Sequence, residues 1–125
     1  FNAGDYLLAQ RARTRIIRNF MDALKDADMI LTPTTAIAAP EIKPGALPDG
    51  DSDLSVTVEI MRFVTAANLT GLPAISFPVG YTTKGLPVGM QAIGRPWQET
   101  SLLRLAVNAE GVVERKEPQV HFKIL

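Results

Sequence analysis

The sequence predicts an α/β fold, and more specifically one part of a larger α/β domain. An amphipathic helical pattern leads directly into a short apolar run at residues 29–32, and two later apolar runs, at 74–81 and 87–93, are typical of a hairpin. After the first apolar run, residues 34–53 show no period of two or 3.6 residues, and loops of this length are uncommon in compact domains. We therefore expect strands from elsewhere to complete the sheet.

Composition narrows the classes of function. The 125 residues are 46% hydrophobic, which is enough for one domain core. Thirteen basic and thirteen acidic residues cancel, so charge gives no support to nucleic-acid binding or to electrostatic capture by a membrane. The absence of cysteine excludes disulfides within these residues, and no apolar run approaches the ~20 residues that span a bilayer. Because the first residue is Phe1 and no signal peptide is visible, we expect an N-terminus made by cutting or processing of a longer chain.

The first expected element is a helix over residues 5–26, with Asp5 as its N-cap. Apolar side chains recur in it at three- and four-residue spacing and predict one buried face, made of Ala9, Ala12, Ile16, Ile17, Phe20, Met21 and Leu24. The strand at residues 29–32 follows it. This strand carries no charge, which predicts burial on both of its faces.

A second helix is predicted over residues 54–67, after an N-cap at Asp53. Its spacing places a mostly apolar set on one face: Leu54, Thr57, Val58, Met61 and Thr65. Spacing alone favours packing of this face in a core. Glu59 and Arg62, three residues apart, are expected to form an exposed ion pair of small energetic value.

The hairpin over residues 74–93 is expected to turn at residues 82–85. One face of each strand is apolar, and the two faces consist of Ile75, Phe77 and Val79 and of Val88, Met90 and Ala92. Pro78 has no N–H to donate, so it should lie at an unpaired or bulged position. Gly89 would allow the close approach of another backbone or of a ligand. Gln91 should face a polar neighbour, because a buried amide without partners costs about 1 to 3 kcal/mol.

A third helix is predicted over residues 100–114, followed by an aperiodic tail at 115–125. Its expected packing face consists of Leu102, Leu105, Ala106, Ala109 and Val112.

The search for catalytic and metal-binding residues gives none within the chain. The single histidine, His121, has no neighbouring ligand, and no serine stands in a G-x-S-x-G context. Asp49, Asp51 and Asp53 alternate as at the start of a calcium loop, but a leucine and an isoleucine occupy the positions that an EF-hand gives to glycine and glutamate. We therefore predict no catalytic residue, no metal site and no cofactor in this chain.

Two stretches resemble the C-terminal part of the amidase signature family. They are ANLTGLPAISFPVG, followed by GLPVGMQ and IGRPW, and the earlier DMILTPTT. This resemblance covers nearly the whole chain. It implies an α/β/α sandwich around a mixed β-sheet, of which the chain is the C-terminal portion, residues 1–125, without the core that bears the catalytic triad.

The resemblance also implies a reaction. Family members use a Ser, cis-Ser, Lys triad to attack an amide carbonyl, and backbone amides stabilise the oxyanion. The serine-rich signature and its lysine lie upstream in the family. The five lysines here match no triad position: Lys25, Lys43, Lys84, Lys116 and Lys123. The implied parent is a hydrolase of amide bonds, and this chain alone is predicted to be inactive.

The resemblance further separates substrate classes. Members that act on glutamine carry an aspartate shortly before the ANL motif, and Met61 stands at that position here. Together with the tracts TVEIMRF and VERKEPQVHFKIL, this resembles plant-type fatty acid amide hydrolases, whose substrates include N-acylethanolamines. The face formed by Leu54, Thr57, Val58, Met61 and Thr65 then becomes a candidate wall of an acyl pocket.

Three hypotheses follow from these observations. The first is the C-terminal segment of a fatty acid amide hydrolase, whose partners are a lipid amide substrate and the rest of the amidase domain, without nucleic acid. The second is another amidase signature enzyme, either a small-amide amidase or one of the subunits of a glutamine amidotransferase. The third is a non-catalytic binding module. We expect an intracellular parent, and the sequence leaves its homo-oligomerisation and peripheral membrane contact open.

Overall fold

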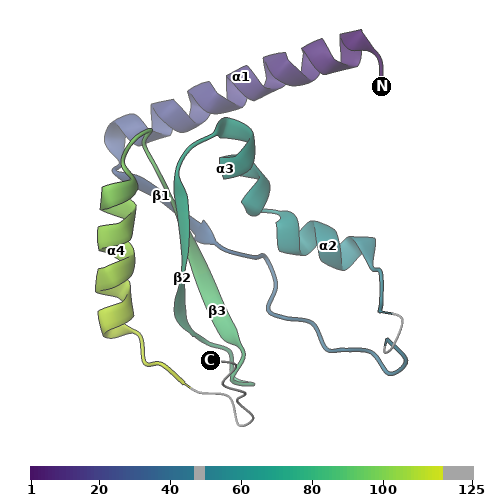
Figure 1. The fold of residues 1–125 in the computed structure, drawn as a ribbon, viewed down its shortest axis with the longest axis vertical. Helices are drawn as coiled ribbons and strands as arrows, with labels where there is room; N and C mark the ends of the chain where they lie inside the picture. Colours follow the sequence, from purple (N-terminus) through teal and green to yellow (C-terminus); the bar gives the residue numbers. More distant parts are fainter. Residues whose placement is uncertain (47–49, 117–125) are drawn as a thin grey trace, which may run out of the picture.

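The computed structural model describes residues 1–46 and 50–116 (Figure 1). The order of elements is α1 (Ala3–Asp26), β1 (Met29–Pro33), α2 (Leu54–Met61), α3 (Val64–Thr70), β2 (Ala74–Tyr81), β3 (Pro87–Gly94) and α4 (Glu99–Val112). None of the described helices is long and apolar enough to cross a bilayer. The expectations for Asp49, His121, Lys123 and the tail beyond Lys116 lie outside the described residues.

The predicted hairpin is confirmed, and it forms a sheet with β1. The strand order is β1-β3-β2, with β3 paired antiparallel to both neighbours. The register shifts between Pro78 and Gly80, which confirms a bulge beside the proline. The turn is closed by a hydrogen bond from the Gly85 N–H to the Thr82 carbonyl, at 2.9 Å, and Gly85 has φ of 80°.

On β3, the close approach expected at Gly89 is made by a threonine side chain, and the polar neighbours expected for Gln91 are confirmed. A Cβ at Gly89 would lie 2.8 Å from Thr34 Oγ1, so the absence of a side chain permits this close approach. The buried Gln91 amide donates from Nε2 to Thr32 Oγ1 at 3.2 Å and to the Phe63 carbonyl at 3.1 Å. The polar groups of the central strand are therefore satisfied by neighbours from distant parts of the chain.

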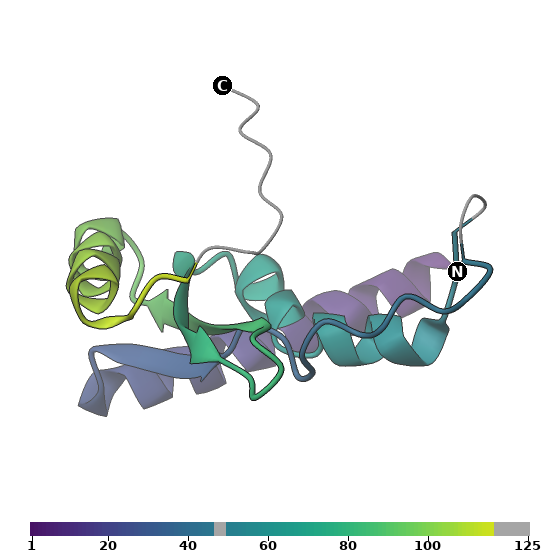
Figure 2. The same ribbon diagram turned by 90° about the horizontal axis from the view of Figure 1, so that it is seen from below.

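Helices cover both faces of the sheet, as the α/β/α expectation requires. On one face, Ile93 packs with Leu24 of α1 and Ala67 of α3. On the other face, Phe77 and Ala92 pack with Leu102 of α4, together with Ile75 and Met90 as predicted. Figure 2 shows α1 and α4 on opposite sides of the strands. Ala92 and Ile93 are adjacent on β3 but pack on opposite faces of the sheet, because side chains alternate along a strand.

The predicted N-cap of α1 is wrong. Asn2 is the N-cap, and its side chain accepts from the Asp5 N–H at 3.0 Å while Asp5 Oδ2 accepts from the Asn2 N–H at 2.9 Å. Asp5 is thus the third residue of a capping box, and both residue types suit a helix start. The predicted face is half-buried or buried only from Ile16 onward, since Ala9 and Ala12 lie beyond the described sheet and are exposed.

Three other expectations need correction. The predicted helix over residues 54–67 is two helices, α2 and α3, separated at Arg62 and Phe63. The predicted burial of residues 29–32 on both faces is wrong, because β1 is an edge strand here and Leu31 is 54% exposed. Val112 is 85% exposed, because it is the last residue of α4 and the chain then leaves the helical path.

Candidate functional site

The face predicted for substrate contact begins at the N-terminus of α2, where Asp53 caps the helix. Asp53 Oδ1 accepts from the Ser55 hydroxyl at 2.5 Å and from the N–H groups of Ser55 and Val56 at 3.0 and 3.3 Å. These hydrogen bonds, the Ser55 hydroxyl first, lower the pKa of the Asp53 carboxyl from 3.8 to about 2. The ionised carboxylate is therefore the capping form at neutral pH.

A lysine in the preceding loop contacts the same cap. Lys43 Nζ lies 3.0 Å from Asp51 Oδ2 and 3.5 Å from Asp53 Oδ2. The hydrogen bond and charge of Asp51, with those of Asp53, raise the pKa of Lys43 above its usual 10.5. The loop is also joined to the hairpin turn by an ion pair between Glu41 and Lys84, at 2.7 Å. These exposed pairs contribute little energy individually, and they lie where the loop runs beside α2 and the hairpin turn.

The five predicted positions are all exposed within the described residues. Leu54, Val58 and Met61 are 78, 63 and 41% exposed. Thr57 Oγ1 donates back to the Asp53 carbonyl at 3.0 Å, so its hydroxyl is satisfied by its own helix. Core packing of this face is therefore absent among the described residues. Thr65 lies on α3, beyond the break, and does not continue the face along one helix.

Two hollows lie beside α2, and each is lined by different members of the predicted set. One, of about 450 Å³, is lined by Ile37 of the loop together with Leu54 and Val58. The other, of about 460 Å³, lies between the loop and the opposite side of α2; Thr57 borders it. Met61 and Thr65 line neither hollow. Leu54 and Val58 thus line one hollow together, while Met61, three residues further along the same face of α2, and Thr65 on α3 lie outside it.

Sequence reasoning missed the second hollow. Its walls are mostly apolar and come from Pro40, Ile42 and Ala46 of the loop and from Val56 and Ile60 of α2. Val56 and Ile60 are four residues apart, and this spacing could have predicted a second apolar face on the helix. The loop residues carried no comparable signal, because they have no periodic pattern and their place beside α2 involves long-range contacts such as the hydrogen bond from the Ala36 N–H to the Glu59 carbonyl.

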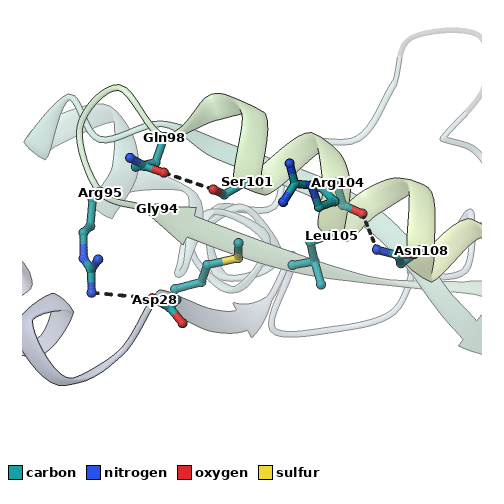
Figure 3. Close-up of a pocket in the computed structure, with 9 residues that line it drawn as sticks. Asp28, Gly94, Arg95, Gln98, Ser101, Arg104, Leu105 and Asn108 are labelled. Carbon is teal, nitrogen blue, oxygen red and sulfur yellow. Dashed lines mark hydrogen bonds and ion pairs between the residues drawn. The ribbon is translucent and has the colours of Figure 1, made fainter.

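A third hollow, of about 320 Å³, is lined mainly by polar residues and lies between α4, the start of β1 and the end of β3 (Figure 3). Ser101 donates to Gln98, Asn108 donates to the Arg104 carbonyl, and Arg95 lies 3.6 Å from Asp28. Most of its polar groups therefore contact one another. In the described part of the chain, no three acidic or histidine side chains gather closely enough to hold a metal ion.

The Amidase family model matches residues 1–103. The chain belongs to the Amidase family. Among its relatives, the fatty acid amide hydrolase of Medicago truncatula is 48% identical over the whole chain, and a glutamyl-tRNA(Gln) amidotransferase subunit of Psychrobacter cryohalolentis is 40% identical over 81% of it. The chain spans about a fifth of the length of these two relatives, 21% and 19% respectively.

Solved structures support the same family. A glutamyl-tRNA(Gln) amidotransferase subunit of Thermotoga maritima superposes with a TM-score of 0.73 at 34% identity, covering 90% of this chain and 23% of that one. The allophanate hydrolase of Kluyveromyces lactis gives a TM-score of 0.72 at 28% identity, covering 90% of this chain and 17% of that one. The predicted α/β fold is thus confirmed as a segment of the amidase signature fold.

Proposed function

We propose that this chain is the C-terminal segment of a serine amidase that hydrolyses fatty acid amides such as N-acylethanolamines. The observation that carries the proposal is the 48% identity to the Medicago truncatula fatty acid amide hydrolase over the whole chain. The amidotransferase relative from Psychrobacter cryohalolentis matches a shorter part of the chain at lower identity. In this proposal, the segment supplies scaffold strands and helices, and the rest of the amidase domain supplies the Ser, cis-Ser, Lys triad.

The same proposal gives α2 one wall of the acyl pocket. Leu54, Val58 and Met61 present exposed apolar side chains, and Thr57 and Thr65 complete the proposed set. An acyl chain against this wall would gain roughly 0.8 kcal/mol for each methylene that leaves water. The binding energy would therefore grow with acyl length, which favours long-chain amides over short ones.

The proposed partners are a lipid amide and the remainder of the domain, without a cofactor or nucleic acid. β1 and β2 each have one edge unpaired within the described residues. Strands of the remaining domain would satisfy these backbone groups and cover exposed side chains such as Leu31.

The test is the substitution Met61→Asp in the full-length protein. A carboxylate in an apolar wall is strongly disfavoured, so we expect the ratio of kcat/KM for long-chain to short-chain amides to fall about tenfold or more. Met61→Leu, which keeps an apolar side chain of similar volume, is the matched control and should keep the ratio. An unchanged ratio in Met61→Asp would show that Met61 is not part of the acyl-pocket wall. Failure of the unmodified full-length protein to hydrolyse any long-chain amide would contradict the proposed substrate class.

A role within a glutamine amidotransferase is a second candidate, favoured by the structural match to the Thermotoga maritima protein. The two candidates differ in their partners. Stable co-purification of the full-length protein with other amidotransferase subunits would favour the second candidate. Binding of long-chain amides by the purified protein without such subunits would favour the fatty acid amide hydrolase.

A further inference from the structure

The side chain of Gln91 joins three separate parts of the fold. Gln91 lies on β3, the central strand, and is only 7% exposed. Its Nε2 donates to Thr32 Oγ1 on β1 and to the carbonyl of Phe63. Phe63 stands between α2 and α3, where the helical path is interrupted. The amide therefore fixes the joint between these two helices to the most internal strand of the sheet.

The position of α2 depends strongly on this joint. In Figure 1, α2 extends away from the strands, whereas α3 packs between it and the sheet. Ala67 of α3 is buried against Leu24 and Ile93, but α2 contains no buried residue. Because α2 contains no fully buried residue, its direction depends mainly on its ends.

A second connection reaches the same end of α2 from the same strand. The Thr34 N–H donates to the Gly89 carbonyl on β3 at 3.0 Å, and two residues later the Ala36 N–H donates to the Glu59 carbonyl at 3.2 Å. The carbonyls of Glu59 and Phe63 thus lie at the end of α2 and are both tied to β3, directly or through one short loop. Of the two connections, only that of Gln91 is made by a side chain and can be removed by substitution.

We propose that Gln91 is a positioning residue that sets acyl-chain selectivity by fixing the direction of α2 through the Phe63 carbonyl. This inference rests on the proposed function, because it assigns a selectivity role to the wall formed by Leu54, Val58 and Met61. Gln91 itself does not touch substrate. Its amide holds the joint, and the joint holds the wall at a defined distance from the acyl chain, where small displacements change reactivity strongly.

The experiment compares Gln91→Met with Thr32→Val in the full-length protein. Gln91→Met keeps the volume of the side chain and removes both hydrogen bonds. Thr32→Val, the matched control, removes only the hydrogen bond to β1 and leaves the donor to Phe63 in place. Two quantities are measured for each variant: the ratio of kcat/KM for long-chain to short-chain amides, and backbone hydrogen exchange in α2 relative to α4.

In Gln91→Met, we expect the ratio of kcat/KM for long-chain to short-chain amides to fall about tenfold, which corresponds to about 1.4 kcal/mol. We also expect backbone hydrogen exchange in α2 to become faster while exchange in α4 is unchanged. In Thr32→Val the ratio should stay within about twofold of the unmodified protein, even if its melting temperature falls. A lower melting temperature in Gln91→Met with an unchanged ratio would show a merely structural role and overturn the proposal. An equal fall of the ratio in both variants would overturn it too.

The two measurements separate this proposal from the proposed function. If the unmodified protein shows no preference for long-chain amides, the substrate class and the selectivity role both fail. The exchange measurement then still decides whether Gln91 holds the joint. If the preference is present but exchange in α2 does not change in Gln91→Met, the proposed function stands and the positioning role of Gln91 fails.

Discussion

Arg95 Nε donates a hydrogen bond of 2.9 Å to the Leu24 carbonyl, so the residue that follows the central strand contacts the end of α1. Arg95 Nη2 also donates to the Ala27 carbonyl at 3.0 Å. Carbonyls at the end of a helix have no partner within the helix and carry partial negative charge, which a guanidinium satisfies well. Arg95 belongs to the IGRPW motif, one of those that carry the family resemblance, and the structure gives that motif a packing role.

Arg95→Met should therefore destabilise the protein without altering its substrate selectivity. We expect a loss of about 2 kcal/mol in the free energy of unfolding, because two charge-assisted hydrogen bonds are removed. Urea unfolding of the full-length protein, followed by circular dichroism, gives this value. Arg104→Met is the control: Arg104 is an exposed arginine on α4, and its loss should change the free energy by less than about 0.5 kcal/mol. Equal effects of the two substitutions would contradict the role of Arg95.

Gly89→Ala tests the close approach between β3 and the loop. The added Cβ would meet Thr34 Oγ1 at 2.8 Å and Thr34 Cβ at 3.2 Å, and it would disturb the 2.6 Å hydrogen bond between the Thr34 and Ser76 hydroxyls. We expect a loss of about 1 to 3 kcal/mol in the free energy of unfolding. Thr34→Ala in the same protein removes Oγ1, the nearer of the two obstructing atoms, so the double variant should lose less than the sum of the two single ones.

Gly111→Ala is the matched control for that substitution. Gly111 lies in α4, and a Cβ there would meet nothing within 4 Å. We expect it to stabilise the protein by about 0.5 to 1 kcal/mol, because glycine is disfavoured inside helices. Thermal unfolding of the two alanine variants should therefore shift in opposite directions. A shift in the same direction would show that the space around Gly89 does not govern its substitution.

The isolated chain should not hydrolyse amides. None of its described lysines stands in a triad context, and the resemblance locates the serine-rich signature upstream. We expect the rate of long-chain amide hydrolysis by the isolated 125 residues to equal that of buffer, whereas the full-length protein should hydrolyse these amides if the proposed function holds. Activity of the isolated chain, lost on treatment with a serine-directed acylating reagent, would show that it contains a nucleophile that the sequence does not reveal.

Local chemistry explains which parts of the fold were predictable. Pro78, Gly89 and Gln91 each impose a requirement on their own position, and the structure meets all three with a bulge, a close contact and two hydrogen bonds. The hairpin itself follows from alternation and turn residues, which are local signals. These features were predicted because the physical reason for each lies within a few residues of it.

The break between α2 and α3 was not predictable in this way. Neither Arg62 nor Phe63 is a helix breaker, and Phe63 caps α3 without any side-chain hydrogen bond. What distinguishes the position is the Gln91 amide, which comes from a strand 28 residues later. The hollow beside Val56 and Ile60 was equally hard to predict, because its other wall is a loop without a periodic pattern, which reaches α2 through a long-range hydrogen bond from Ala36 to Glu59. Long-range contacts of this kind leave no periodic signal in a sequence.

The cap of α2 should weaken in acid within a defined range of pH. The folded pKa of Asp53 is about 2 and its ordinary value is 3.8, so the carboxylate stabilises the folded chain fully above pH 3.8. That contribution is lost as the pH falls from about 4 to about 2, where the folded state takes up the proton. Protection of the Ser55 and Val56 amides against hydrogen exchange, corrected for the intrinsic rate and compared with α4, should fall over this range. In Asp53→Asn, which caps a helix without titrating, the same protection should stay level. A parallel fall in both proteins would assign the acid effect to another group.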